Sequence, residues 1–108
     1  VGSFTSVVTT PVANQINCGF TPRYIKVACV GTGGLESEWF EGMADATCNQ
    51  RTLAGVGSAV AAAAITPSIT AGGTDNQGRT IPTGARGFTV GTACQSATAQ
   101  TVRWIALG

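Results

Sequence analysis

Alternating side chains in residues 18–30 constrain the fold of this chain more than any other sequence feature. Gly19 and Pro22 mark a turn at the start of this stretch, because Pro22 fixes its own φ and lacks a backbone donor. From residue 24 onward, two sets of side chains point to opposite sides: Ile25, Val27 and Cys29 on one, and Tyr24, Lys26 and Ala28 on the other. A period of two residues is typical of a strand with one buried and one wetter face. We therefore predict a strand over residues 24–30.

The same alternation closes the chain over residues 101–107, where Val102, Trp104 and Ala106 oppose Thr101, Arg103, Ile105 and Leu107. Further strands are expected over residues 4–12, 36–43, 45–53 and 87–91, separated by turns rich in Gly and Pro. Seven or eight short strands with turn signals every ~8–12 residues indicate an all-β fold. We predict a single domain, residues 1–108, folded as an antiparallel β-sandwich or jelly roll.

The Ala-rich residues 54–65 leave two structures open. By propensity they form the one helix candidate of the chain, with Ser58 as a plausible N-cap. In an otherwise β chain, small residues also suit a strand that another sheet or subunit approaches closely. Residues 71–78 and 92–100 are predicted to be loops, since they are dense in turn-forming and polar residues.

Charge is scarce in this chain: 10% of residues are charged, and the formal net charge is +1. A free monomer usually keeps a charged surface and a net charge away from zero. The low charge therefore favours a protein packed against copies of itself or against another protein; a small neutral soluble domain is the alternative. Nucleic acid is not an expected partner because no basic stripe exists. No run of about 18 apolar residues is present, so no membrane-spanning helix is expected.

The chain contains no His, which removes the Ser-His-Asp and Cys-His arrangements of nucleophilic catalysis and the commonest metal ligand. Glu36, Glu38 and Glu41 form the only cluster of carboxylates. Their expected role is a solvated acidic face, or one that meets Arg residues of a neighbour, since a glycosidase needs a deep cleft. We expect no enzymatic activity, no cofactor and no metal.

The four cysteines are Cys18, Cys29, Cys48 and Cys94, and none forms a Cys-x-x-Cys pair that would indicate zinc. Cys18 and Cys29 flank the strand of residues 24–30 and lie too far apart along it to bond each other. An even count allows two disulfides, with three possible pairings. A protein made in a reducing cytosol would keep its cysteines as thiols and use them as small apolar side chains. Whether disulfides form stays open at the level of the sequence.

The aromatic residues divide between core and surface. Trp104 and Phe88 lie in well-defined strand patterns and are expected in the core. Trp39 and Phe40 are adjacent, so a strand points them to opposite faces: one belongs in the core and the other is free for a contact. Aromatic and Arg side chains are typical anchors of protein interfaces. Contact with another subunit is therefore the expected role, and stacking on a sugar is the alternative.

Four short motifs, taken in order, resemble a known class of proteins. They are Gly19-Phe20-x-Pro22 followed by Tyr24-Ile-Lys-Val27, then Glu38-Trp-Phe-Glu-Gly-Met43, then Gly87-Phe-Thr-Val-Gly91, and finally Val102-Arg-Trp-Ile-Ala106. Their order is similar to that in small β-sandwich structural proteins of tailed bacteriophage virions, which include head decoration or cement proteins and domains of head and tail fibres. Residues 54–65 and the cysteines are not part of this pattern.

The resemblance implies a non-enzymatic virion protein, synthesised in the host cytoplasm and located on the capsid surface or a fibre. The first expectation is a decoration or cement subunit that binds and stabilises an assembled phage shell as a homo-oligomer. Its partners would be copies of itself and the major capsid protein or another virion protein. The alternative is a fibre-type or lectin-like domain that binds a receptor or carbohydrate. Candidate residues for the partner or oligomer interface are Arg23, Tyr24, Lys26, Trp39, Phe40 and Arg103.

Overall fold

A computed structural model describes residues 1–5, 12–29, 34–52, 55–69, 73–74, 78–82, 84–95 and 100–108 of the chain. These residues form ten strands and one short 3-10 turn, η1. The strands are β1 (Gly2–Thr5), β2 (Asn14–Ile16), β3 (Tyr24–Cys29), β4 (Leu35–Phe40), β5 (Thr47–Thr52), β6 (Gly57–Thr66), β7 (Gly73–Thr74), β8 (Thr80–Ile81), β9 (Phe88–Val90) and β10 (Thr101–Leu107), and η1 spans Thr92–Cys94.

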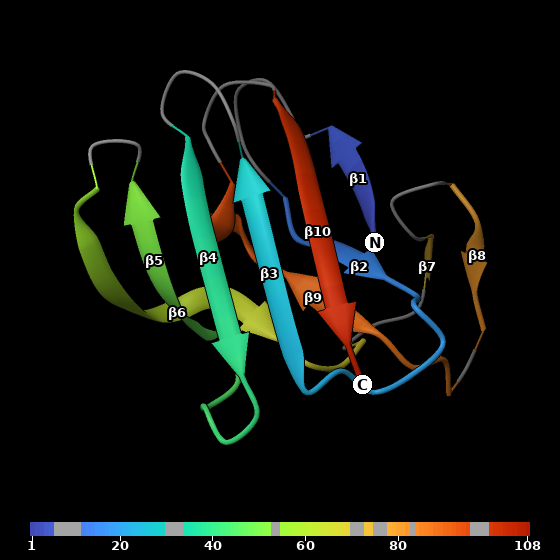
Figure 1. Cartoon of the computed structure of the whole chain (residues 1–108). Helices are drawn as coiled ribbons and strands as arrows, with labels where there is room; N and C mark the ends of the chain where they lie inside the picture. Colours follow the sequence, from blue (N-terminus) through green and yellow to red (C-terminus); the bar gives the residue numbers. More distant parts are fainter. Residues whose placement is uncertain are drawn as a thin grey trace.

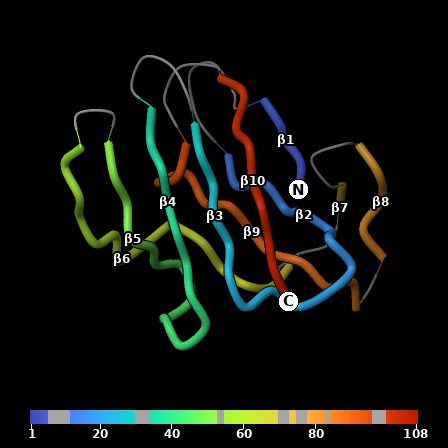
Figure 2. Tube along the Cα trace, viewed as in Figure 1, coloured from blue at the N-terminus to red at the C-terminus, as the bar shows by residue number. Residues whose placement is uncertain are grey.

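Eight strands form one antiparallel sheet in the order β1-β10-β3-β4-β5-β6-β9-β2, and β7 pairs with β8 in a separate ribbon. Figure 1 shows β10, β3, β4 and β5 side by side, while β6, β9 and β2 cross behind them, so the sheet curls into a half-barrel. The predicted all-β antiparallel fold is confirmed. The trace in Figure 2 shows that the first and last strands lie next to each other, as their register from Gly2↔Trp104 to Thr5↔Thr101 requires.

The two alternating stretches behave as their patterns predict. In β3, Ile25, Val27 and Cys29 are buried, and the intervening residues are half-buried. In β10, Val102 and Ala106 are buried, whereas Arg103 and Ile105 are exposed. Because β10 pairs with β3 over its length, the two alternations lie in register and build one continuous buried face. Residue 30, the predicted last residue of the β3 strand, lies outside the described residues.

Residues 57–66 are a strand, which resolves the choice left open for the Ala-rich segment. The register of β5 and β6 jumps from Cys48↔Val60 to Thr47↔Ile65, so β6 bulges and bends between its two halves. Ala63 adopts a positive φ of 54° in this bend. Beyond it, the N–H of Ala64 donates to the Ala46 carbonyl at 3.1 Å. Pairing with neighbours on both sides therefore overrides the helix propensity of alanine.

Other predicted boundaries shift. The first strand begins at Gly2, two residues before the predicted start at residue 4, and it is described as far as Thr5; residues 6–11 of the predicted strand 4–12 lie outside the described residues. The predicted loop 71–78 contains the short strand β7, which is held by pairing with β8. The predicted loop 92–100 begins with the 3-10 turn η1. The position of β1 depends on pairing with β10 at the far end of the chain, whereas β7 and η1 are held by partners that lie close by in sequence.

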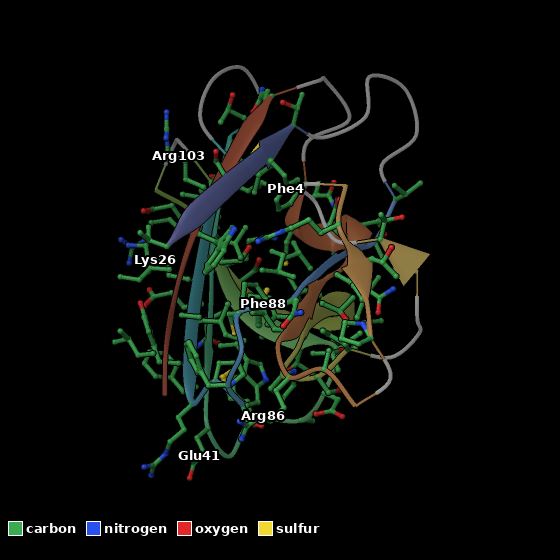
Figure 3. All side chains as sticks on the ribbon, turned by 90° about the vertical axis from the view of Figure 1, so that its right-hand side faces the viewer. Phe4, Lys26, Glu41, Arg86, Phe88 and Arg103 are labelled. Atoms are coloured by element: carbon green, nitrogen blue, oxygen red, sulfur yellow. The ribbon has the colours of Figure 1, made fainter. Side chains whose placement is uncertain are left out.

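The core fills the concave side of the curled sheet. Phe88 lies between the two layers in Figure 3 and is fully buried. Its ring meets Trp104 edge-on with 5.2 Å between ring centroids, so both aromatics predicted for the core contribute to it. The other buried apolar residues of this cluster are Phe4, Ile16, Ile25, Val27, Cys29, Trp39, Cys48, Ala64, Ile65, Val90, Cys94, Val102 and Ala106.

The motif Gly87-Phe-Thr-Val-Gly91 encloses β9 between two close backbone approaches. A Cβ on Gly87 would lie 1.9 Å from the Ile16 carbonyl oxygen, and one on Gly91 would lie 2.1 Å from that of Ala63. Both glycines are therefore required by the packing of β9 between β2 and β6. The described residues include no helix long and apolar enough to cross a membrane.

Candidate interaction surface

The convex side of β10, β3, β4 and β5 presents a second set of side chains to solvent, and we call it the outer face. Cross-strand register places Arg103, Ala28, Glu36 and Arg51 in one row, since each is the direct partner of the next. A second row runs through Ile105, Lys26, Glu38 and Asn49, and a third through Leu107, Tyr24 and Phe40. In Figure 3, Lys26 and Arg103 point away from the body of the protein on the side opposite Phe88.

Charge is concentrated on this face. Of the six basic and five acidic side chains of the chain, the first two rows hold Lys26, Arg51, Arg103, Glu36 and Glu38, which we call the charged rows. The ammonium of Lys26 lies 3.3 Å from Glu36 Oε1. Both side chains are substantially exposed, so this pair adds little to stability. The arrangement instead offers alternating positive and negative groups to a partner.

An apolar cluster, formed by Tyr24, Phe40, Ile105 and Leu107, borders the charged rows at one end of the sheet. Phe40, Ile105 and Leu107 are 46%, 39% and 53% exposed. The ring of Tyr24 contacts that of Phe40 with 5.2 Å between centroids and a tilt of 55°. Burial of these exposed aromatic and aliphatic side chains against a partner would be favourable, because it would remove apolar surface from water.

Tyr24 connects the apolar cluster to the charged rows. Its hydroxyl donates a hydrogen bond to Glu38 Oε2 at 2.7 Å. Burial, together with the hydrogen bond to Glu38 and the negative charge of that carboxylate, raises the pKa of Tyr24 to about 12. The phenol therefore stays protonated at neutral pH and holds the Glu38 carboxylate in a defined position.

Arg23 and Glu41 extend the outer face at the edge where β3 begins and β4 has ended. The Arg23 guanidinium forms an ion pair with the Glu41 carboxylate through Nε, and its Nη2 donates to Oε1 at 3.4 Å. The backbone is tied here as well, because the N–H of Glu41 donates to the Arg23 carbonyl at 2.8 Å. The hydrogen bond with Glu41 raises the pKa of Arg23, so this guanidinium is charged at any physiological pH.

Five of the six predicted interface residues therefore lie on the outer face or its edge: Arg23, Tyr24, Lys26, Phe40 and Arg103. The sixth, Trp39, is only 4% exposed, and its indole N–H donates to the Ala44 carbonyl at 3.2 Å. The adjacent pair Trp39-Phe40 divides between core and surface as the alternation predicts. Trp39 belongs to the core and does not contribute to the outer face.

Sequence reasoning did not select Arg51, Ile105 and Leu107 as interface candidates. The signal for Ile105 and Leu107 was present, because they share the Arg103 side of the alternating closing strand. Arg51 carried no such signal, since residues 47–52 are almost uniformly polar. Only the pairing of β5 with β4, which sets Glu36 opposite Arg51, places it on this face.

A hollow of about 280 Å³ lies over the charged rows. It is lined by Lys26, Glu36, Glu38, Asn49 and Arg51, among others. These groups can form many hydrogen bonds with a polar ligand. No group of three or more His, Cys, Asp or Glu side chains within the described residues is arranged to hold a metal ion.

Comparison of the chain with protein families, with curated proteins and with solved structures gives no match. The outer face must therefore be interpreted from its own geometry and from the motif order of the sequence.

Proposed function

We propose that this protein is a non-enzymatic structural subunit of a phage virion, a decoration or cement protein that binds an assembled capsid. The proposal rests on the motif order of the sequence together with one observation, the apolar cluster exposed beside the charged rows. Its partners are copies of itself and the major capsid protein or another virion protein. Its location is the surface of the virion, after synthesis in the host cytoplasm.

The composition of the outer face supports a docking role. Interfaces are enriched in aromatic residues and Arg relative to other surfaces, and this face combines Tyr24 and Phe40 with Arg51 and Arg103. The outer face is carried by four paired antiparallel strands, which hold its side chains on a rigid scaffold. The apolar cluster would supply most of the affinity, and the charged rows would set the orientation of the two partners.

Co-sedimentation with phage shells that lack the protein tests this function. We expect the wild-type chain to sediment with the shells and Phe40→Ser to lose at least tenfold in affinity, because a buried aromatic anchor contributes on the order of 2 kcal/mol. Val56→Ser is the matched control, since Val56 is 63% exposed but lies outside the outer face. Wild-type protein that stays in the supernatant at all shell concentrations would refute the proposal.

The hollow over the charged rows favours a second candidate function, a fibre-type or lectin-like domain that binds carbohydrate. Carboxylate, amide and guanidinium groups around the hollow match the hydroxyl groups of a sugar, and the Tyr24 and Phe40 rings lie along the same face. A glycan array distinguishes the two functions. Binding that is abolished by Asn49→Ala and retained in Val56→Ser would favour the carbohydrate function, and uniform silence would remove it.

A further inference from the structure

Two buried cysteines from distant parts of the chain meet inside the half-barrel. The Sγ atoms of Cys48, on β5, and Cys94, at the end of η1, lie 3.9 Å apart, although 46 residues separate them in sequence. Each side chain is only 1% exposed. All four cysteines are free thiols in this structure, and an S–S bond of about 2 Å would require these two sulfurs to approach by roughly a further 2 Å.

A polar network holds the two sulfur atoms near each other. Gln50 Nε2 donates to the Ala93 carbonyl at 2.7 Å, which ties η1 to β5 next to Cys94. The same nitrogen donates to the hydroxyl of the fully buried Ser37 at 3.2 Å. The Ser37 hydroxyl also lies within hydrogen-bonding reach of both sulfurs, where it favours the thiolate form of each, although the pKa of Cys94 is raised by its other surroundings. Hydrogen bonds next to both cysteines therefore hold β5 and η1 together and keep the two thiols close to each other.

The other two cysteines have different partners. Cys29 Sγ donates to Gln100 Oε1 at 2.7 Å, and Cys18 Sγ donates to the Phe20 carbonyl at 3.3 Å. Among the described contacts, Cys48 and Cys94 are therefore the one pair of cysteines whose sulfur atoms lie close together.

We propose that Cys48 and Cys94 form the one native disulfide of this protein under oxidising conditions, while Cys18 and Cys29 remain thiols. This inference does not rest on the proposed function. The bond would join β5 to the turn that follows β9, and so would cross-link the front strands of the curled sheet to the strands behind them. Reducing compartments keep thiols reduced. The disulfide would therefore be absent while the chain is in such a compartment and would form after the chain leaves it.

The chemistry is thiol–disulfide exchange with a low-molecular-weight disulfide such as oxidised glutathione. The thiolate of one of the two cysteines attacks one sulfur of this oxidant and displaces a thiolate, forming a mixed disulfide. The thiolate of the other cysteine then attacks the protein sulfur of this mixed disulfide and displaces the second thiolate. Two protein thiols are oxidised, one small disulfide is reduced to two thiols, and these take up the two protons.

In the closed protein, Cys48 is the more acidic of the two thiols. The hydrogen bond from Cys94 lowers the pKa of Cys48, whereas the same hydrogen bond and burial raise the pKa of Cys94. A dissolved oxidant cannot reach either sulfur in the closed protein, because both are buried. Exchange therefore proceeds during folding or when the chain opens, and sub-denaturing urea should accelerate it.

Peptide mapping of the whole chain tests the proposal. The protein is refolded in buffers of increasing ratio of oxidised to reduced glutathione, its free thiols are alkylated, and it is digested with trypsin and a Glu-specific protease. Cleavage after Glu41 and Arg51 separates Cys48, on residues 42–51, from Cys29, and Cys94 lies on residues 87–103. We expect a reducible link between these two peptides as the dominant product, with Cys18 and Cys29 alkylated.

Thermal unfolding supplies the matched controls. A cross-link that closes a loop of this length should raise Tm by about 10 °C or more in the oxidised protein. Dithiothreitol should remove this increase from wild type and from Cys18→Ser, and should have no effect on Cys94→Ser. Absence of the linked peptide at every glutathione ratio, or a dominant link through Cys18 or Cys29, would overturn the proposal, and this mapping needs no variant to fold.

Discussion

At the scale of single residues, Tyr24 offers a direct test of the outer face, because it is the only tyrosine in the chain. Phenolate absorbance therefore reports this one group. Burial and the hydrogen bond to Glu38 place its pKa at about 12, compared with about 10 in an unfolded chain. We expect an absorbance titration to give a midpoint near 12 for the folded protein. In Glu38→Gln the midpoint should fall only part of the way to 10, since burial is the larger cause.

The same shift predicts how stability depends on pH. The folded chain retains the phenol proton to a higher pH than the unfolded chain, so the stability that this proton contributes is complete below about pH 10 and is lost as pH rises towards 12. We expect a loss of about 1 kcal/mol in the free energy of unfolding, because solvent screens a half-buried group. Urea unfolding at pH 9 and pH 11.5 measures it, with Tyr24→Phe as the control. Equal losses in both proteins would contradict this account.

Residue-scale alternation was readable from the sequence in β3, in β10 and in the adjacent aromatic pair of β4. Ile25 and Val27 on β3, Val102 and Ala106 on β10, and the split between Trp39 and Phe40 all followed from a period of two. The alternation did not show which aromatic of this pair faces the core, and Trp39 and Phe40 were therefore both interface candidates. The pairing Ile25↔Trp39, beside the buried Ile25, decides it.

At the scale of elements, β9 depends on the glycine at its end. In Gly91→Ala the new methyl group would meet the Ala63 carbonyl, and backbone atoms cannot move aside cheaply. We expect a loss of about 3 kcal/mol or more in the free energy of unfolding. Urea unfolding followed by circular dichroism measures this loss.

Gly57→Ala is the matched control for that prediction. A Cβ on Gly57 would lie 3.8 Å from the Gln50 carbonyl oxygen, an ordinary contact. Its stability should stay within about 0.5 kcal/mol of wild type. If the two variants lost equal stability, the close approach of Gly91 to β6 would not be the reason for the glycine.

The structure of β6 shows where sequence reasoning at this scale reaches its limit. Ala-rich residues have the highest helix propensity, yet residues 57–66 are a bulged strand with neighbours on both sides. Helix propensity acts locally, whereas the pairing of Ile65 with both Thr47 and Val90 joins segments far apart in sequence. The close approaches of β2 and β6 to the glycines at 87 and 91 likewise depend on strand order.

At the scale of the whole molecule, the apolar cluster predicts self-association. Sedimentation velocity of the wild-type chain should reveal an oligomer whose dissociation constant rises about tenfold or more in Leu107→Ser, because the exposed side chain would be buried between subunits. Val56→Ser should behave as wild type. A wild-type chain that remains monomeric at high concentration would exclude contact between copies, and would leave the shell as the partner to be tested.

Much of this face could be predicted as a set of residues, but not as a surface. The low overall charge indicated that the remaining charges and exposed aromatics were candidates for contacts, and Arg23, Tyr24, Lys26, Phe40 and Arg103 do lie together. Their arrangement into rows required the order β10-β3-β4-β5, in which the last strand of the chain lies beside the third. Local periodicity carries no information about that order.

The position of β10 also has a consequence for how the protein is made. Among the described residues, β1 pairs with β10 and with no other strand, and β3 has β10 as one of its two neighbours. A chain that leaves the ribosome from its first residue onward must therefore expose β1 and one side of β3 until residues 101–107 have emerged. The front of the sheet can therefore close only after residues 101–107 have emerged, and the speed of this step is limited by closure of the long loop between β1 and β10.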